Sequence, residues 1–500
     1  MLESILTEEN PWWKSKDEIY KDKKLVELNK SIFSWDPRIR HKIEYTKDIV
    51  YSLRGPRQVG KTTLIKIQIK DFLEKDVSPW NIMYYAFDLE DSPKEVVKII
   101  KNYLDNTKRR RGESRCYVFL DEISSVKNWQ KAIKNLWDKD KLANCTIVVT
   151  GSHSIDLKMA HERLPGRKGE TNEAYDKIML PMKFSEYCSI IDNDLKNLIE
   201  KNFRHNNDRI EIFKKLLKNE IDPKIEEASS FSSELNRYLL DYMVTGGIPN
   251  VINDYLKNGY INEYTYTTYF DSIIGDINYL DIDERKFKKL IANIIKDMSF
   301  PTSWNALQKD TDIGSWHTVD RYINLLRDMF IITVFYQYDS EKKGPLQEKA
   351  KKIHFHDVFF FHTLNTWTSP HKSFELSKEY VLKEDNQGHL IEGIIGDHLI
   401  RLSFNISERK QRFDYSNYLF YWRYHKDKEK EVDYIFYNGQ EIEIPIEVKF
   451  TNRISNRDLD GIFNFKKYTG VKNGLIISKE SLEAVKDYVK IPAYIFLLLI

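Results

Sequence analysis

Short apolar runs alternate with longer segments of helical periodicity between residues 48 and about 190. The short runs predict buried strands, and the longer segments, in which apolar residues recur every three or four positions, predict helices. Such alternation is typical of an α/β sheet. Five strands are expected, at residues 48–54, 81–89, 117–122, 146–152 and 178–182. A helix is expected at residues 64–73, directly after the first strand and its loop.

The pattern changes after residue 190. Residues 191–280 are predicted to form a polar, helical lid or connector with a flexible segment at 226–233. Residues 281–365 are predicted to hold three helices followed by a hairpin, which suggests a winged helix. The helix expected at 316–329 could enter the major groove of DNA, or the whole region could be a helical module that packs on protein. Both interpretations stay open.

A second α/β region is expected at residues 385–500. A helix is predicted from residue 388 to 402, followed by three strands at 421–424, 431–436 and 445–449. The last ten residues, 491–500, are almost wholly apolar. They are too few to span a bilayer, so they predict a buried final strand.

Composition adds limits on domain number and location. The chain has 500 residues, of which 41% are apolar, which is enough for several domains. The 78 basic and 76 acidic residues nearly cancel, so a DNA-binding surface would have to be a local patch. Three scattered cysteines indicate a reducing compartment. No signal peptide or membrane span is evident, and a cytoplasmic protein is expected. The predicted parts are a helical extension at 1–47, an α/β core at 48–190, and the regions 191–280, 281–365 and 385–500.

The stretch from Gly55 to Thr63 fits the phosphate-loop pattern G-x-x-x-x-G-K-S/T. Its glycines let successive backbone N–H groups face one concavity, and the next helix points its positive end there. Lys61 can reach the β- and γ-phosphates, and the Thr62 hydroxyl can bind Mg²⁺. A plain glycine turn is disfavoured, because strand, loop and helix follow in order. The predicted nucleotide contacts are Gly55, Pro56, Arg57, Gln58, Val59, Gly60, Lys61, Thr62 and Thr63.

Two acids end the third predicted strand. Asp121 would lie beside the phosphate loop, where ligands bind in open α/β sheets, and is predicted to hold Mg²⁺. Glu122 is the candidate base that orients and deprotonates the attacking water. A solvated turn is the alternative, which the upstream phosphate loop disfavours.

Polar residues follow the fourth strand. Ser152 could contact the γ-phosphate, or could belong to a plain turn around Gly151. Arg163 and Arg167 could neutralise charge in the transition state, within one chain or on a second copy, or could be solvated loop residues. An oligomer is therefore possible.

The C-terminal region holds a second set of charged residues. Glu447 and Lys449 are two apart on one predicted strand, so they share a face, and Asp433 lies on a strand expected to pair with it. Two carboxylates suit Mg²⁺, Glu392 could add a ligand, and a lysine can activate water. This set is that of a metal-dependent phosphodiesterase. The alternative is an exposed strand of alternating charge.

Several motifs together support a family resemblance. They are GPRQVGKTT (55–63), FLDEI (119–123), VTGSHS (149–154), PGR (165–167), LPMKFSEY (180–187), GGIP (246–249), GHLIEG (388–393), EVDYIF (431–436) and IPIEVKF (444–450). With them the chain resembles the prokaryotic AAA-like ATPases, common in archaea, that carry a C-terminal domain of unknown function related to restriction-endonuclease-like folds. The resemblance implies an ASCE/AAA-like P-loop domain, ATP and Mg²⁺ as cofactors, and a nuclease-like motif at Glu392, Asp433, Glu447 and Lys449. Arg167 matches a Gly-Arg pair of that family.

Two functions follow. In the first, ATP hydrolysis is coupled to DNA binding or cleavage by the C-terminal domain. In the second, the protein is an ATP-dependent switch or scaffold for a protein partner, and the C-terminal domain is catalytically silent. A helicase-like motor is disfavoured, because no second ATPase domain is evident.

Overall fold

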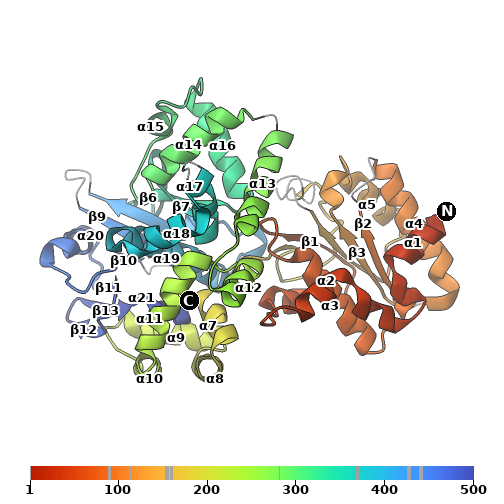
Figure 1. The fold of residues 1–500 in the computed structure, drawn as a ribbon, viewed down its shortest axis with the longest axis horizontal. Coiled ribbons are helices and arrows are strands. Elements are labelled where there is room, and N and C mark those ends of the chain that lie inside the picture. Colours follow the sequence, from red (N-terminus) through yellow and green to blue (C-terminus); the bar gives the residue numbers. More distant parts are fainter. Residues whose placement is uncertain are drawn as a thin grey trace. The chain divides into compact units, whose positions relative to one another are not determined.

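The structure, a computed structural model, describes residues 2–87, 92–111, 114–151, 157, 162–280, 282–367, 369, 371–424, 430–437 and 443–500 (Figure 1). These residues form two compact units. The first contains residues 1–180 and 410–412, and the second contains residues 181–409 and 413–500. The parts predicted at 281–365 and 385–500 thus lie in the same unit, because both contribute strands to one sheet.

A five-stranded sheet forms the centre of the first unit, in the order β2-β3-β4-β1-β5. Every pairing in it is parallel. Its strands are β1 (Ile49–Arg54), β2 (Ile82–Ala86), β3 (Cys116–Asp121), β4 (Cys145–Thr150) and β5 (Asp176–Ile178). The first four match predicted strands, because apolar runs are typical of strands that helices cover on both faces. The fifth strand was predicted at 178–182, but β5 shares only Ile178 with that range.

Helices complete this unit. They are α1 (Leu2–Glu9), α2 (Lys23–Asn29), α3 (Lys61–Glu74), α4 (Pro93–Arg111) and α5 (Gln130–Trp137). Short 3₁₀ helices lie between them: η1 (Pro11–Trp13), η2 (Lys16–Lys21), η3 (Arg38–Lys42), η4 (Pro79–Asn81) and η5 (Ile123–Ser125).

The N-terminal segment covers the edge strand β2. The Asn10 side chain accepts from the Tyr84 backbone N–H at 2.7 Å and donates to the Tyr84 carbonyl at 2.9 Å. The indole N–H of Trp13 donates to the Ile82 carbonyl at 2.9 Å. These side chains satisfy backbone groups that an edge strand would otherwise leave open.

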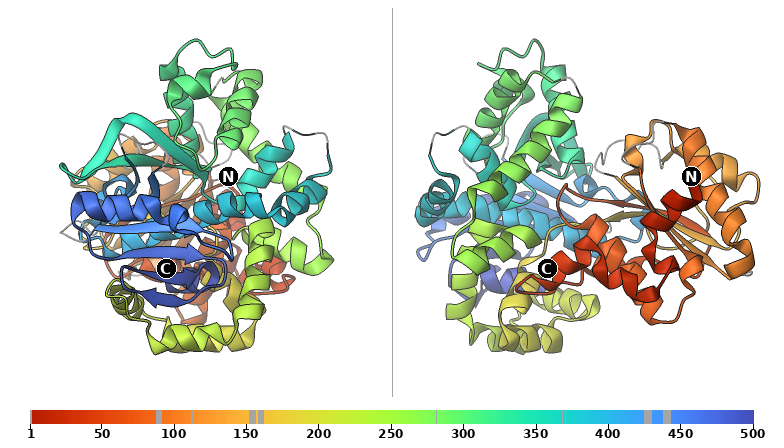
Figure 2. Two further views of the ribbon diagram at one scale, coloured as in Figure 1. Left: turned by 90° about the vertical axis from the view of Figure 1, so that its left-hand side faces the viewer. Right: turned by 45° about the vertical axis from the view of Figure 1, so that its right-hand side comes forward.

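A mixed eight-stranded sheet dominates the second unit, in the order β12-β13-β11-β10-β9-β8-β6-β7. Its strands are β6 (Ile332–Asp339), β7 (Gly344–Phe355), β8 (Leu419–Arg423), β9 (Glu431–Tyr437), β10 (Glu443–Lys449), β11 (Gly474–Ser478), β12 (Glu483–Val485) and β13 (Tyr488–Pro492). Figure 2 shows the C-terminal strands of this sheet in blue.

Helices surround this sheet. They are α7 (Phe184–Ile191), α8 (Asn193–Asn202), α9 (Asn206–Leu216), α10 (Pro223–Ser229), α11 (Ser232–Thr245), α12 (Pro249–Asn258), α13 (Glu263–Tyr279), α14 (Glu284–Lys296), α15 (Trp304–Gln308), α16 (Trp316–Asp328), α17 (Val358–Trp367), α18 (Ser373–Leu382), α19 (Glu384–Ile406), α20 (Asp460–Thr469) and α21 (Ala493–Leu499). Two more 3₁₀ helices precede β8, η6 (Lys410–Arg412) in the chain segment assigned to the first unit and η7 (Tyr415–Asn417), and a third, η8 (Asn456–Leu459), precedes α20. The segment 226–233, predicted to be flexible, spans the end of α10 and the start of α11.

The predicted winged helix is not confirmed. Three helices and a hairpin are present as expected, but the hairpin β6–β7 is the edge of the eight-stranded sheet, and Gln337 of β6 pairs with Tyr421 of β8. The hairpin therefore belongs structurally to the C-terminal domain. The sequence pattern did not predict that the hairpin joins this sheet, because the pairing of distant strands has no signature in the sequence of either strand.

The prediction of a final strand at 491–500 was wrong. The last strand, β13, ends at Pro492, and the residues after it form the helix α21. All seven residues of α21 are buried, so it lacks the polar face that usually identifies a helix. A buried helix and a buried strand have the same apolar pattern when both are short.

The longest described helix is α19, with 23 residues. It packs against β7, β8, β9 and β10, and most of its residues from Leu390 to Ser403 are buried. Among the described helices, none combines the length and the hydrophobicity that crossing a membrane requires.

Candidate functional site

The phosphate loop lies between β1 and α3, as predicted. Gly55 adopts φ +149°, and a Cβ at this position would lie 2.1 Å from the Met179 carbonyl oxygen, so only glycine fits. The loop curls around Lys61, whose ammonium donates to the carbonyl oxygens of Gly55 at 3.1 Å and Pro56 at 2.9 Å. Lys61 is buried, so its charge is directed at the loop rather than at bulk water.

Asp121 ends β3 and is 2% exposed. Its Oδ2 accepts from the Thr62 hydroxyl at 2.8 Å and from the Tyr84 hydroxyl at 2.9 Å. Its Oδ1 accepts from the Thr150 hydroxyl. The four residues come from α3, β2, β3 and β4, whose ends meet at one edge of the parallel sheet. A carboxylate beside a threonine hydroxyl fits the Mg²⁺ site of a P-loop protein.

Glu122 follows Asp121 in a left-handed conformation, with φ 52° and ψ 27°. This conformation is uncommon for residues other than glycine and costs about 1 kcal/mol or more. It ends β3 abruptly and begins η5. Local strain of this kind is frequent at functional sites.

The remaining predicted nucleotide residues have different outcomes. Arg167 forms an ion pair with Asp138, with Nε 2.6 Å from Oδ1, and also donates to the Pro165 carbonyl at 3.1 Å. Its role at the nucleotide stays a prediction. Ser152 lies outside the described residues.

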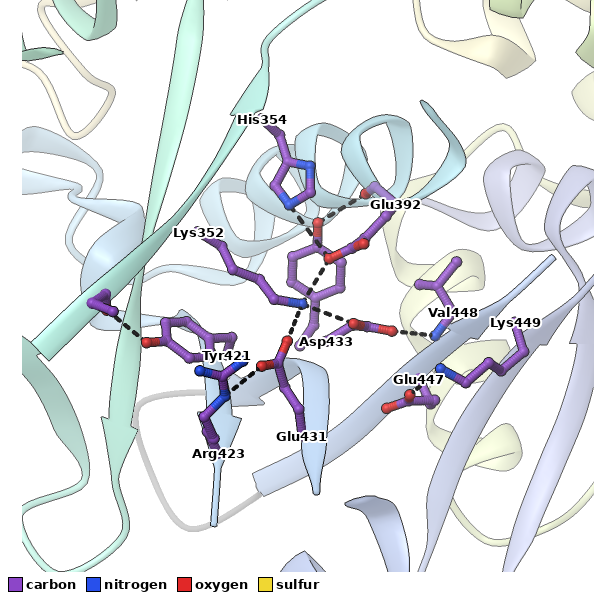
Figure 3. Close-up of polar contacts among 12 residues, drawn as sticks. Lys352, His354, Glu392, Tyr421, Arg423, Glu431, Asp433, Glu447, Val448 and Lys449 are labelled. Carbon is purple, nitrogen blue, oxygen red and sulfur yellow. Dashed lines mark hydrogen bonds and ion pairs between the residues drawn. The ribbon is translucent and has the colours of Figure 1, made fainter. Parts of the chain in front are cut away.

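Two of the acids predicted in the C-terminal domain, Glu392 and Asp433, surround a lysine together with Glu431, and neither this lysine nor Glu431 was predicted as a site residue (Figure 3). The Lys352 ammonium lies 2.8 Å from Glu392 Oε1, 2.6 Å from Glu431 Oε1 and 2.8 Å from Asp433 Oδ1. We call these four residues the Lys352 cluster. The Lys352 side chain is 1% exposed. Burial by itself lowers the pKa of this lysine, but the three carboxylates outweigh burial and raise it well above its usual value. Lys352 is therefore charged.

A bulge in β9 directs two neighbouring residues towards α19. Phe420 pairs with Ile435 and Trp422 pairs with Val432, which leaves Asp433 and Tyr434 together opposite a single residue of β8. As a result Asp433 contacts Lys352, and the Tyr434 hydroxyl donates to the Glu392 carbonyl at 2.8 Å.

Glu447 and Lys449 form a separate pair beside the cluster. Their charged groups are 2.7 Å apart, as the two-residue spacing predicts. Asp433 is nearby, because its Oδ2 accepts from the backbone N–H of Val448 at 2.9 Å. Burial, and then the negative charge of Asp433, raise the pKa of Glu447 to about 8.

The Lys352 cluster does not fit a divalent metal. Among the described residues, no group of three or more His, Cys, Asp and Glu side chains is arranged to hold a metal ion. The structure brings Glu392 and Asp433 together as expected, but it places an ammonium between them. Glu392 and Asp433 are thus ion-paired with Lys352, and Glu447 with Lys449. Their role as metal ligands stays a prediction.

Sequence reasoning missed Lys352, although a signal was present. Polar Lys352, His354 and His356 alternate with Ile353 and Phe355. Every second residue of a strand shares a face, and a face with three basic or ionisable residues needs an acidic partner. That partner is α19: His354 Nε2 lies 3.4 Å from Glu392 Oε1, and His356 Nδ1 lies 2.5 Å from Asp397 Oδ1.

Comparison with known families divides the chain into three matched regions. Residues 47–188 match the AAA domain family. Residues 236–371 and 387–494 match two domains of unknown function, DUF8612 and DUF4143. The first unit therefore carries an ATPase-type P-loop domain, whereas the C-terminal match leaves its function open.

Relatives and solved structures are distant. An uncharacterised protein of Methanocaldococcus jannaschii, MJ1637, is 24% identical over 465 residues, which cover 92% of this chain and 86% of that protein. An uncharacterised protein of Haemophilus influenzae is 25% identical over 337 residues, which cover 65% of this chain and 72% of that protein. The Walker-type ATPase PABY2304 of Pyrococcus abyssi is 14% identical with a TM-score of 0.40, covering 66% of this chain and 95% of that one.

Proposed function

We propose that the first unit hydrolyses ATP with Mg²⁺. The observation that carries this proposal is the Thr62 hydroxyl held 2.8 Å from the Asp121 carboxylate, directly beside a phosphate loop. Bound Mg²⁺ would neutralise charge that develops on the phosphates. Thr62 and Asp121 would hold the ion, and the Lys61 ammonium would leave the loop carbonyls for the β- and γ-phosphates.

Glu122 is proposed as the residue that orients the attacking water. It directly follows the metal-side acid, at the carboxyl end of β3, where nucleotides bind in parallel sheets. A carboxylate at this point can accept a proton from water as the water attacks the γ-phosphate. Glu122→Gln should therefore retain ATP binding but lose turnover.

The test of ATP hydrolysis is phosphate release by Lys61→Ala and Asp121→Asn, each compared with Lys70→Ala. Lys70 lies on the same helix with a partly exposed side chain and serves as the matched control. Both variants in the site should lose at least 100-fold in turnover, because removal of a single electrostatic contact in a phosphoryl-transfer site has effects of this order. Unchanged turnover in Lys61→Ala would disprove the assignment of the loop.

For the C-terminal domain, the structure favours the second of the two functions, an ATP-dependent switch in which this domain does not cleave nucleic acid. The supporting observation is that, across the part of the chain that the structure describes, the acids of the nuclease-like motif are not grouped as metal ligands. A direct check is Mg²⁺- or Mn²⁺-dependent nicking of plasmid DNA. Nicking by the natural chain that Glu447→Ala with Lys449→Ala abolishes would establish the first function, with cleavage, instead.

A further inference from the structure

The Lys352 cluster is a closed arrangement of charges. An ammonium has three N–H donors, and three carboxylates from two different elements accept them: Glu392 of α19, and Glu431 and Asp433 of β9. The distances, 2.6 to 2.8 Å, are those of charge-assisted hydrogen bonds. Arg423 adds a second cation, with its Nε 2.8 Å from Glu431 Oε2.

A divalent ion would need the same oxygen atoms. Mg²⁺ binds carboxylate oxygens at about 2.0 to 2.1 Å, so the point equidistant from these oxygens cannot hold both an ion and an ammonium. Two like charges this close also repel strongly in a buried site, where screening by water is weak. Lys352 and a metal are therefore alternatives.

Lys352 is fixed in place by its surroundings. It lies within β7, where it pairs with Phe335 of β6. Its side chain is 1% exposed, and its ammonium lies 6.0 Å from the centre of the Tyr421 ring. His354, two residues further along β7, is fully buried beside Glu392 on the same face.

We infer that Lys352 is the resident cation of the C-terminal domain and takes the position that a divalent metal would need. This inference deepens the proposal of a non-cleaving C-terminal domain and rests on it, but it does not depend on ATP hydrolysis. The hairpin β6–β7 thereby acquires a role: it delivers the cation that joins α19 to β9. The acids of the nuclease-like motif then stabilise the fold rather than bind a metal.

The consequence is that removal of the lysine creates a metal site. Lys352→Ala leaves Glu392, Glu431 and Asp433 without their shared cation. We expect small shifts of these side chains to let them bind an oxygen-liganded ion such as Mn²⁺ in place of the ammonium. The matched control is Lys351→Ala, which removes the same group from the adjacent residue of β7, where the ammonium lies 4.9 Å from the centre of the Trp304 ring.

The experiment measures Mn²⁺ binding by electron paramagnetic resonance on the full chain without nucleotide. All samples carry Asp121→Asn, so that the phosphate-loop unit contributes no Mn²⁺ site. With Lys352 present, addition of Glu392→Gln should leave Mn²⁺ binding unchanged. With Lys352→Ala, the protein should bind one further Mn²⁺ at least tenfold more tightly than the protein that retains Lys352 binds any Mn²⁺ there. Adding Glu392→Gln to Lys352→Ala should remove this ion. Lys351→Ala should not produce it.

Three results would overturn the inference. The first is a Mn²⁺ that binds in the presence of Lys352 and is lost with Glu392→Gln. The second is a folded Lys352→Ala protein that gains no Mn²⁺, and the third is an equal gain of Mn²⁺ in Lys351→Ala. If Lys352→Ala fails to fold, the comparison with and without Glu392→Gln in the presence of Lys352 decides by itself. The readout is metal binding, so failure here is distinct from failure of the ATPase, seen as phosphate release, and from DNA nicking.

Discussion

The Tyr84 hydroxyl donates a hydrogen bond to Oδ2 of Asp121, across 2.9 Å, and shares that oxygen atom with the Thr62 hydroxyl. Tyr84 also bonds through its backbone to Asn10. One residue of an edge strand thus connects the N-terminal segment to the proposed metal-side acid. Two predictions follow from its two sets of bonds.

Tyr84→Phe should alter the Mg²⁺ requirement of ATP turnover. The substitution removes one of three hydroxyl donors that orient the Asp121 carboxylate, so more Mg²⁺ should be needed for half-maximal turnover, by a few-fold. The loss of one hydrogen bond to a buried carboxylate should also cost about 1.5 to 3 kcal/mol of stability. Turnover measured against Mg²⁺ concentration checks the first effect. Tyr117→Phe on β3 is the control, and equal Mg²⁺ curves for the two variants would contradict the prediction.

Asn10→Ala should destabilise the first unit. It leaves the N–H and the carbonyl of Tyr84 buried without their partner, at about 1 to 3 kcal/mol for each group. Urea unfolding, followed through the transition of the first unit, measures the change. Asn29→Ala, at an exposed site on α2, should change the free energy of unfolding by less than about 0.5 kcal/mol. Similar values for both variants would show that the segment does not stabilise β2.

Gly247→Ala should disrupt the second unit. A Cβ at Gly247 would lie 2.1 Å from the Met182 carbonyl oxygen, and its N–H already donates to Asp357 Oδ2 at 2.8 Å. The backbone would have to move, so we expect a loss of about 3 kcal/mol or more, or insoluble protein. The control is Gly275→Ala in α13, where the new Cβ meets nothing within 4 Å and should stabilise the helix by about 0.5 to 1 kcal/mol. Thermal unfolding compares the two, and a folded, unperturbed Gly247→Ala protein would refute the close approach.

His362 should make the second unit sensitive to acid. Burial lowers the pKa of His362 to about 4, and its Nε2–H donates to the Met243 carbonyl at 2.8 Å. Above about pH 6.5 the imidazole is neutral in both states, so its stability contribution is complete. As the pH falls from about 6.5 to 4, the unfolded chain binds a proton that the folded chain does not, and stability falls by about 3 kcal/mol.

His362→Gln tests this directly, since the glutamine amide can also donate to the Met243 carbonyl. Its unfolding temperature should fall less between pH 7 and pH 4.5 than that of the natural chain. His371→Gln, at an exposed site, should leave the acid dependence unchanged. If His362→Gln and the natural chain have parallel pH profiles, another group causes the acid sensitivity.

The first unit was largely predictable, because its signals are local. The phosphate loop is one continuous stretch, and Asp121 ends a strand whose apolar run is visible by itself. The carboxyl ends of parallel strands meet at one edge, so the meeting of Thr62 and Asp121 follows from their positions in the chain. The third donor, Tyr84, was not predictable, because it lies inside an apolar strand and nothing local indicates its partner.

By itself, the sequence determined the α/β class, the phosphate loop with its strand-end acids, and the residues that could approach one another in the C-terminal domain. Only the tertiary structure decided that the hairpin β6–β7 joins the C-terminal sheet, that the chain ends in the helix α21, and that Lys352 stands among Glu392, Glu431 and Asp433. The physical reason is the distance in sequence between the interacting residues. Periodicity and loop motifs reflect the conformation of neighbouring residues. The pairing of distant strands, and the placement of a buried lysine among carboxylates, depend on contacts between segments that only the folded chain brings together.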